Sequence, residues 1–156
     1  MKKFATVFLV VILGGFLVAP AQAGPKHQDQ NHWRPGCAQR FDQVVRKRDV
    51  AFQARDLTRL MPTYRQDAVE IDPTGAYLPG KATIEAHLTN LFAVDFVSTF
   101  VEYQRIVDGC GTALLVLESR FSNPAIGINM HFITSQTFTY ERGQWLLLLA
   151  ANTTIP

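Results

Sequence analysis

The 156-residue chain carries 15 Lys and Arg residues against 13 Asp and Glu residues, a formal net charge of +2 at neutral pH. This near balance argues against nucleic-acid binding, which needs clustered basic residues, and the short basic run at residues 46–48 is expected on a solvated helix face. The length suits a single domain with one buried core.

The N-terminal residues predict a secretory signal peptide. Lys2 and Lys3 precede an apolar run over residues 4–18, and Ala21 and Ala23 supply the small side chains that a signal peptidase recognises. We expect residues 1–23 to be removed and the product to be exported, either to a periplasm or out of the cell. An uncleaved membrane anchor is the alternative, but the apolar run is short for one. No membrane association is expected after cleavage.

Residues 24–36 form a polar segment with two prolines, which predicts a flexible lead-in to a domain over residues 37–156. His27 and His32 lie in this segment. A metal site needs further Cys or His ligands nearby, and none follow, so no metal is expected.

Cys37 and Cys110 are the two cysteines of the chain. A pair of cysteines in an oxidising compartment can form a disulfide, and we predict that these two do. The alternatives are two free thiols or a bond between two chains. Neither cysteine lies in a CxxC motif, so a structural role is favoured over a redox role.

Helical spacing begins at Ala38 and predicts a first helix. Its apolar stripe consists of Phe41, Val44, Val45 and Phe52. Asp56 is the predicted N-cap of a second, shorter helix, which Pro62 should end or bend. The expected core positions of that helix are Leu57, Leu60, Met61 and Tyr64.

Residues 68–72 predict a short strand that stops at the turn Pro73-Thr74-Gly75. Alternation places Val69 and Ile71 on one face of this strand and Glu70 and Asp72 on the other. Gly80 then precedes a third helix with core positions at Ile84, Leu88, Leu91 and Phe92. His87 shares this stripe, so we expect it to face inward.

Four longer strands follow, over residues 99–107, 112–121, 128–140 and 145–154, separated by turn-forming residues. The third of them alternates between apolar and polar residues, which indicates one packed face and one wetter face. Helices followed by an antiparallel meander predict an α+β domain, in which a curved antiparallel sheet wraps around about three N-terminal helices.

Several short sequence motifs occur in a characteristic order. They are Ala51-Phe52-x-Ala54-x-Asp56-Leu57, Tyr64-x-x-Asp67-Ala68-Val69-x-x-Asp72-Pro73-x-Gly75, Gly80 with Ile84, and Gly143-x-Trp145. Together they resemble the nuclear transport factor 2-like superfamily, and within it the SnoaL-like and SgcJ/EcaC-type group. The resemblance implies a cone-shaped sheet that, together with the helices, encloses a pocket, in a domain that often pairs through the outer face of its sheet. The superfamily includes isomerases, cyclases, dehydratases and domains without known chemistry, so the fold alone assigns no function.

The segment from Val69 to Gly75 also resembles ketosteroid isomerases, in which the aspartate before the Pro-x-Gly turn removes a proton next to a ketone. Asp72 matches that aspartate. The oxyanion donors of those enzymes do not match, because the helix tyrosine falls near Arg48 and the second donor, an aspartate, has no counterpart in residues 135–138. Steroid isomerase activity is therefore not favoured.

We predict Asp72 and His87 as candidate catalytic residues. The predicted ligand-pocket residues are Tyr64, Tyr77, Glu118, Arg120 and Asn152. Structural roles are the alternatives: Asp72 would cap its own turn, Glu118 and Arg120 would form a solvent-facing pair, and Asn152 would bond to nearby backbone. His131 is expected on the wetter face.

Two functions stay open. In the first, which we prefer, the exported domain binds a small, largely apolar molecule or acts as a dimeric interaction module, with a homodimer formed through the sheet. In the second, it is a cofactor-free isomerase, cyclase or dehydratase-like enzyme with Asp72 as general base. No cofactor is expected, because the sequence has no phosphate-binding loop, nucleophile elbow or helical pair of histidines.

Overall fold

The structure is a computed structural model that describes residues 35–155. The predicted signal peptide (residues 1–23) and residues 24–34 of the predicted lead-in, with His27 and His32, lie outside the described residues. No helix within the described range is long and apolar enough to cross a membrane.

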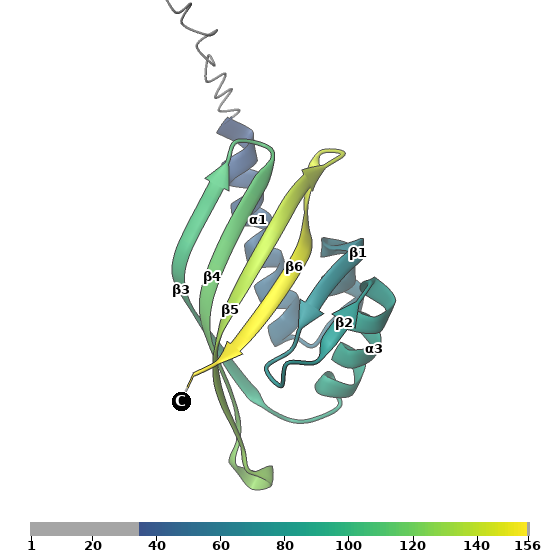
Figure 1. The fold of residues 1–156 in the computed structure, drawn as a ribbon, viewed down its shortest axis with the longest axis vertical. Helices are drawn as coiled ribbons and strands as arrows, with labels where there is room; N and C mark the ends of the chain where they lie inside the picture. Colours follow the sequence, from purple (N-terminus) through teal and green to yellow (C-terminus); the bar gives the residue numbers. More distant parts are fainter. Residues whose placement is uncertain (1–34, 156) are drawn as a thin grey trace, which may run out of the picture. The chain divides into compact units, whose positions relative to one another are not determined.

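Three α-helices and a short 3-10 helix form before the long strands (Figure 1). They are α1 (Pro35–Gln53), α2 (Leu57–Leu60), the 3-10 helix η1 (Met61–Thr63) and α3 (Lys81–Phe92). As predicted, Asp56 caps α2, because its Oδ1 accepts a hydrogen bond from the Arg59 backbone N–H (3.0 Å). Pro62 lies in η1, where the chain leaves the helix.

Six strands form one sheet in the order β2-β1-β6-β5-β4-β3. Their bounds are β1 (Tyr64–Ile71), β2 (Tyr77–Pro79), β3 (Val97–Asp108), β4 (Thr112–Asn123), β5 (Ile128–Glu141) and β6 (Gln144–Thr154). β1 pairs with β6 in parallel, and the other neighbours are antiparallel. A second 3-10 helix, η2 (Pro124–Ile126), joins β4 to β5. The fold is the predicted α+β class.

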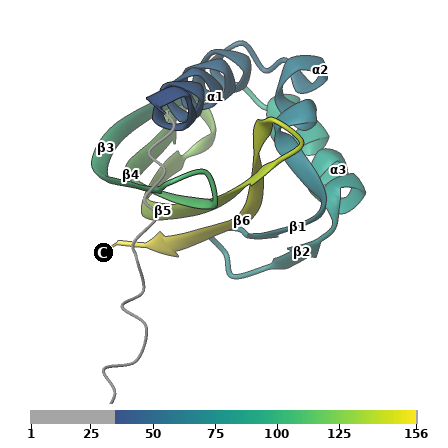
Figure 2. The same cartoon turned by 90° about the horizontal axis from the view of Figure 1, so that it is seen from above.

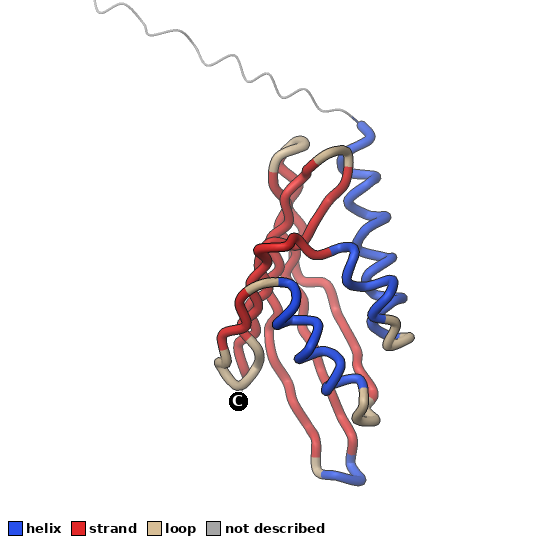
Figure 3. Tube along the Cα trace, turned by 90° about the vertical axis from the view of Figure 1, so that its right-hand side faces the viewer, coloured by secondary structure: helices blue, strands red, loops and turns tan. Residues whose placement is uncertain are grey.

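The sheet curves around α1, and α1 and α3 lie on the same side of it (Figures 2 and 3). Phe41 of α1 packs edge-on against Phe138 and Trp145, with ring centroids 5.0 and 5.3 Å away. The indole of Trp145 donates a hydrogen bond to the Cys37 carbonyl oxygen (2.9 Å), which satisfies the one polar atom of a buried side chain. These contacts hold α1 against β5 and β6.

Cys37 and Cys110 form the predicted disulfide, with Cα atoms 5.5 Å apart and a sequence separation of 73 residues. The bond joins the first turn of α1 to the turn between β3 and β4. In the chain-entropy account, closing a loop of this length stabilises the folded state by about 4 kcal/mol.

Two local predictions need correction. Tyr64, predicted on the second helix, is the first residue of β1, because the helical run ends at Thr63 after Pro62. It remains buried, but on the sheet. Residues 77–79, not predicted as a strand, form β2, which is only three residues long and borders β1 alone. So short a segment carries no readable alternation.

Candidate functional site

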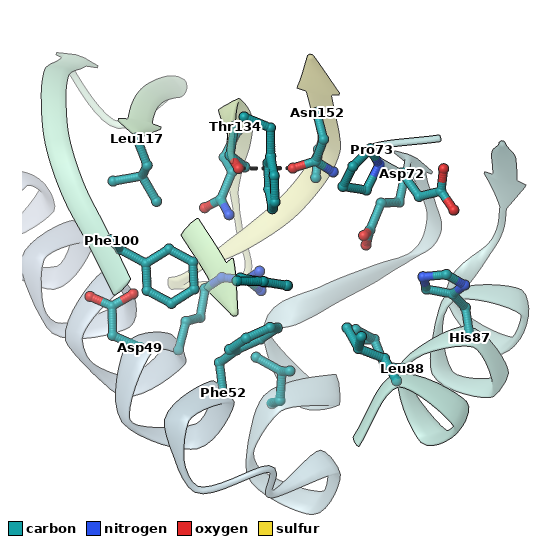
Figure 4. A pocket seen from close by; sticks show the side chains of 18 of the residues that line it. Asp49, Phe52, Asp72, Pro73, His87, Leu88, Phe100, Leu117, Thr134 and Asn152 are labelled. Atoms are coloured by element: carbon teal, nitrogen blue, oxygen red, sulfur yellow. Dashed lines mark hydrogen bonds between the residues drawn. The ribbon is translucent and has the colours of Figure 1, made fainter. Parts of the chain in front are cut away.

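A cavity of about 200 Å³ lies between the concave face of the sheet, α1 and α3 (Figure 4). Most of its walls are apolar. They include the side chains of Phe52, Leu88, Leu91, Phe100, Leu117 and Phe121. Small-molecule sites are typically of this kind, apolar with a few placed polar groups.

The floor of the cavity follows from strand register. Gln136 of β5 pairs with Ala150 of β6, and Ala150 pairs with Glu70 of β1, so these three side chains point to the same face. Because Ala150 is small, it leaves space between the two polar side chains. Thr134 and Asn152 form a second pair on this face.

Asn152 links two strands at the cavity. Its Nδ2 donates to the Ile71 carbonyl oxygen (2.8 Å), and its Oδ1 accepts from Thr134 Oγ1 (2.8 Å), the contact drawn in Figure 4. The side chain therefore lines the cavity and also holds nearby backbone. The two roles considered from the sequence coexist.

Asp72 lies in the cavity wall and caps its own turn. Its Oδ1 accepts hydrogen bonds from the Thr74 N–H (2.8 Å), the Thr74 hydroxyl (2.6 Å) and the Ala76 N–H (2.9 Å). Burial acts to raise the pKa of this carboxyl, but the hydrogen bonds from Thr74 and Ala76, with a smaller effect of His87, hold the pKa below its usual value. A carboxylate stabilised in this way is a weak base.

His87 lies on α3 and lines the cavity on the same side as Asp72 (Figure 4). Its imidazole is half-buried, as its position on the apolar stripe predicted. The structure thus brings together Asp72 and His87, the two predicted catalytic candidates, at one wall. Tyr64 and Asn152 line the same cavity.

Tyr77, Glu118 and Arg120, predicted to line the pocket, do not lie on it. Tyr77 is 64% exposed on β2. Glu118 and Arg120 lie on the other face of β4, because Leu117, Ser119 and Phe121 are the buried, inward-facing residues of that strand.

Glu118 joins a network on that outer face. It accepts hydrogen bonds from Tyr103 and Arg120 (2.7 Å) and contacts His131 Nε2 (2.8 Å). The Tyr103 hydroxyl, followed by Arg120, lowers the pKa of Glu118 to about 2. Glu118 and Arg120 thus form the solvent-facing pair considered as the alternative to a pocket role. His131 lies beside them, on the face where it was expected.

Glu70 was not singled out from the sequence, yet it is a carboxyl at the cavity floor. The residue is half-buried and lines the cavity. Burial raises the pKa of Glu70 to about 7, against a smaller lowering effect of Arg48 and a raising effect of Asp72. Glu70 therefore changes charge near neutral pH, which Asp72 does not.

Arg48 of α1 lines the same cavity, and its charge acts on the Glu70 carboxyl. Its side chain is only 6% exposed, and its guanidinium lies over the rings of Tyr64 (4.5 Å to the centroid) and Phe138 (5.5 Å). Nη1 donates to Thr63 Oγ1 (2.5 Å). A guanidinium has five N–H donors, so this group can also serve a bound molecule.

Two sequence signals could have found these residues. Arg48 falls on the helical stripe of Phe41, Val45 and Phe52, where a charged side chain must point inward. Glu70 lies with Asp72 on the polar face of the predicted strand. Among the described residues, no group of three His, Cys, Asp or Glu side chains is placed to hold a metal ion.

A curved mostly antiparallel sheet around N-terminal helices, with a cavity between them, defines the nuclear transport factor 2-like fold, as the sequence predicted. No protein-family model matches the chain, and a search of curated proteins finds no match. Solved structures do match it.

Three similar structures illustrate the fold. A nuclear transport factor 2-like protein of unknown function from Pseudomonas putida has 19% identity and a TM-score of 0.64, with 76% of this chain and 86% of that one covered. A protein with a cystatin-like fold from Caulobacter vibrioides has 15% identity and a TM-score of 0.65, covering 78% and 91%. A ketosteroid isomerase-like protein from Erwinia carotovora atroseptica has 15% identity and a TM-score of 0.57, covering 74% and 93%. At these identities the similarity establishes the fold alone.

Proposed function

We propose that the chain is an exported domain whose cavity binds a small, largely apolar molecule. The observation that carries this proposal is an apolar cavity of about 200 Å³ with polar groups gathered on its floor. An apolar cavity of about 150 Å³ accommodates benzene, so the volume suits a molecule built on a single ring. The precise subgroup, SnoaL-like or SgcJ/EcaC-type, remains a prediction from the sequence.

Export is part of the proposal. The disulfide between Cys37 and Cys110 supports it, because such bonds persist in oxidising compartments. The destination would be a periplasm or the extracellular medium. Cleavage after Ala23, measured by N-terminal sequencing of the exported product, tests this part.

Thermal unfolding in the presence of single-ring aromatic compounds tests ligand binding. A ligand at a hundred times its Kd stabilises the folded state by about 2.7 kcal/mol. Ala150→Leu would fill the cavity floor and should abolish the stabilisation. Ala151→Leu adds the same atoms to the next residue of β6, which is not among the cavity-lining residues, and should leave it intact. Equal stabilisation of both variants would contradict binding in the cavity.

A cofactor-free isomerase, cyclase or dehydratase-like enzyme with Asp72 as general base is the alternative. Asp72 and His87 share one cavity wall, and the ketosteroid isomerase-like neighbour has the same fold. The geometry supports binding better, because Asp72 is committed to the hydrogen bonds of its own turn and its pKa is lowered. Proton exchange of a ketone that survives in Asp72→Asn would exclude Asp72 as the base.

We also propose that two copies pair through the outer face of the sheet, opposite the cavity. Exposed apolar side chains lie there, among them Val101 (55% exposed) and Ile106 (47%) of β3. Glu118 and Arg120 lie on the same face, so it carries both charges and can be complementary to itself in a two-fold arrangement.

A further inference from the structure

We propose that the ligand of the cavity is a small carboxylic acid with an apolar ring, whose carboxyl group lies between Arg48 and Glu70 and shares one proton with Glu70. This inference rests on the proposed ligand-binding function and names the class of ligand. It follows from the positions of the two side chains, from the charges around them and from the character of the walls.

The two side chains approach the same part of the cavity from opposite walls. Arg48 comes from α1 and lies over the ring of Phe138, whereas Glu70 comes from the sheet in the row of Gln136. Phe138 and Gln136 are successive inward-facing residues of β5. The charge of Arg48 acts on the Glu70 carboxyl, yet the described residues contain no ion pair between them within 4.0 Å. A carboxyl group bound here would contact both.

The balance of charge favours a ligand that brings one acidic group. A buried guanidinium needs a compensating negative charge. A ligand carboxylate and an ionised Glu70 together would supply two such charges, and one of them would lack a partner. One shared proton leaves a single negative charge beside Arg48. Because the pKa of Glu70 is about 7, that proton is available near neutral pH.

Other charged groups around Glu70 do not take this role. Asp72, just beyond the end of β1, is held ionised by its turn. Asp49 on α1 also lines the cavity, and burial raises its pKa against the lowering effects of Arg48 and Arg105, but the residue is exposed. Tyr64 faces the same space with a pKa raised by burial, and His87 lines the cavity from α3. Of these groups, Glu70 is the carboxyl whose pKa burial raises to about 7, and it lies on the sheet in the row of Gln136.

Other head groups fit less well. An amine would place a second cation beside Arg48, and like charges repel strongly where the dielectric constant is low. An amide would leave the guanidinium without a counter-charge whenever Glu70 is protonated. The apolar part of the ligand would lie against Phe52, Phe100 and Phe121, whose rings line the cavity and pack edge-on or tilted against one another.

Isothermal titration calorimetry with three probes of one shape tests the inference. The probes are 3-phenylpropanoate, 3-phenylpropanamide and 3-phenylpropylamine, titrated into the purified protein from pH 5.5 to 8.5. At pH 6 we expect the acid to bind at least about tenfold more tightly than the other two. Below pH 7 Glu70 already holds its proton, so the affinity for the acid is at its maximum. Above pH 7 binding must take up a proton, so the affinity falls by about tenfold per pH unit.

Variants identify the groups responsible. Glu70→Gln imitates protonated Glu70, so its affinity for the acid should not change between pH 6 and 8.5, and buffers of different ionisation enthalpy should give the same heat. His87→Gln is the matched control and should keep the pH dependence. Arg48→Gln should lose at least about tenfold in affinity for the acid while its affinity for the amide is unchanged.

Circular dichroism shows whether each variant folds; if Arg48→Gln does not, the comparison of Glu70→Gln with His87→Gln decides alone. Equal binding of acid and amide, tighter binding of the amine, binding of none of the three, or a pH dependence that follows His87 would each overturn the carboxylic-acid inference. Binding of the amide alone would leave the proposed ligand-binding function standing. A cavity that stabilises no ring compound in the thermal experiment would remove both.

Discussion

Asn152 of the last strand donates a hydrogen bond to the carbonyl oxygen of Ile71 (2.8 Å), the residue that directly precedes Asp72. The bond fixes the end of β1 against β6, strands that are far apart in sequence and pair in parallel. Because Thr134 donates to the same Asn152 side chain, three strands meet at this amide. The polar floor of the cavity depends on it.

Replacement of Asn152 by Ala should destabilise the domain by about 1–3 kcal/mol, because the Ile71 carbonyl and the Thr134 hydroxyl each lose a partner. Chemical denaturation measures the change. Asn129→Ala, an exposed position on β5, should change the free energy of unfolding by less than about 0.5 kcal/mol. Equal effects would show that the bonds of Asn152 contribute nothing to stability.

The disulfide should contribute strongly to stability. The double variant Cys37→Ser, Cys110→Ser is expected to lose about 2–5 kcal/mol in the free energy of unfolding. Reductant should lower the denaturation midpoint of the natural chain and leave that of the double variant unchanged. If reductant had no effect on the natural chain, the bond would not be present in solution.

Glu70 predicts a specific dependence of stability on pH. Its pKa is about 7 in the folded chain against an ordinary value of 4.5, so the unfolded chain gives up this proton at lower pH. The favourable contribution of protonated Glu70 is full below pH 4.5 and is lost as the pH rises to about 7. Glu70→Gln should therefore be about as stable as the natural chain at pH 4, and at pH 8 more stable by up to about 3 kcal/mol. A difference that did not grow with pH would contradict the buried position of this carboxyl.

Pairing through the outer sheet face makes Ile106 a sensitive position. Ile106→Lys should convert a dimer to a monomer, because it places a charge within the proposed interface. Multi-angle light scattering at micromolar concentration measures the mass. The matched control is Val50→Lys, on an exposed site of α1, which should leave the dimer intact. A natural chain that is monomeric under these conditions would rule out the proposed pairing.

Much of the fold was predictable because local signals and the global arrangement agree. The stripe around Phe41, the cap at Asp56 and the turns between the four long strands each identify an element. The same patterns placed His87 toward the cavity. The start of β1 at Tyr64 was missed because the helical run ends at Thr63, just after Pro62 and one residue before the end that the apolar spacing suggested.

The site was less predictable because the face of the sheet on which a strand residue lies depends on the register of that strand with its neighbours. Glu118 was predicted to line the pocket, but the more deeply buried residues of its strand are Leu115, Leu117 and Ser119, on the other face. A strand that carries apolar side chains on both faces gives no clear alternation. Arg48 and Glu70 were missed for a different reason: their chemistry depends on facing each other across a cavity, which no spacing along the chain reveals.

The most direct test of a ligand-binding cavity with Glu70 at its floor is a carbon-detected NMR titration of the Glu70 carboxyl, assigned with Glu70→Gln, with and without 3-phenylpropanoate. The account predicts a pKa of about 7 for the protein alone and a higher pKa when the acid is bound. An ordinary pKa that does not respond to the acid would contradict it.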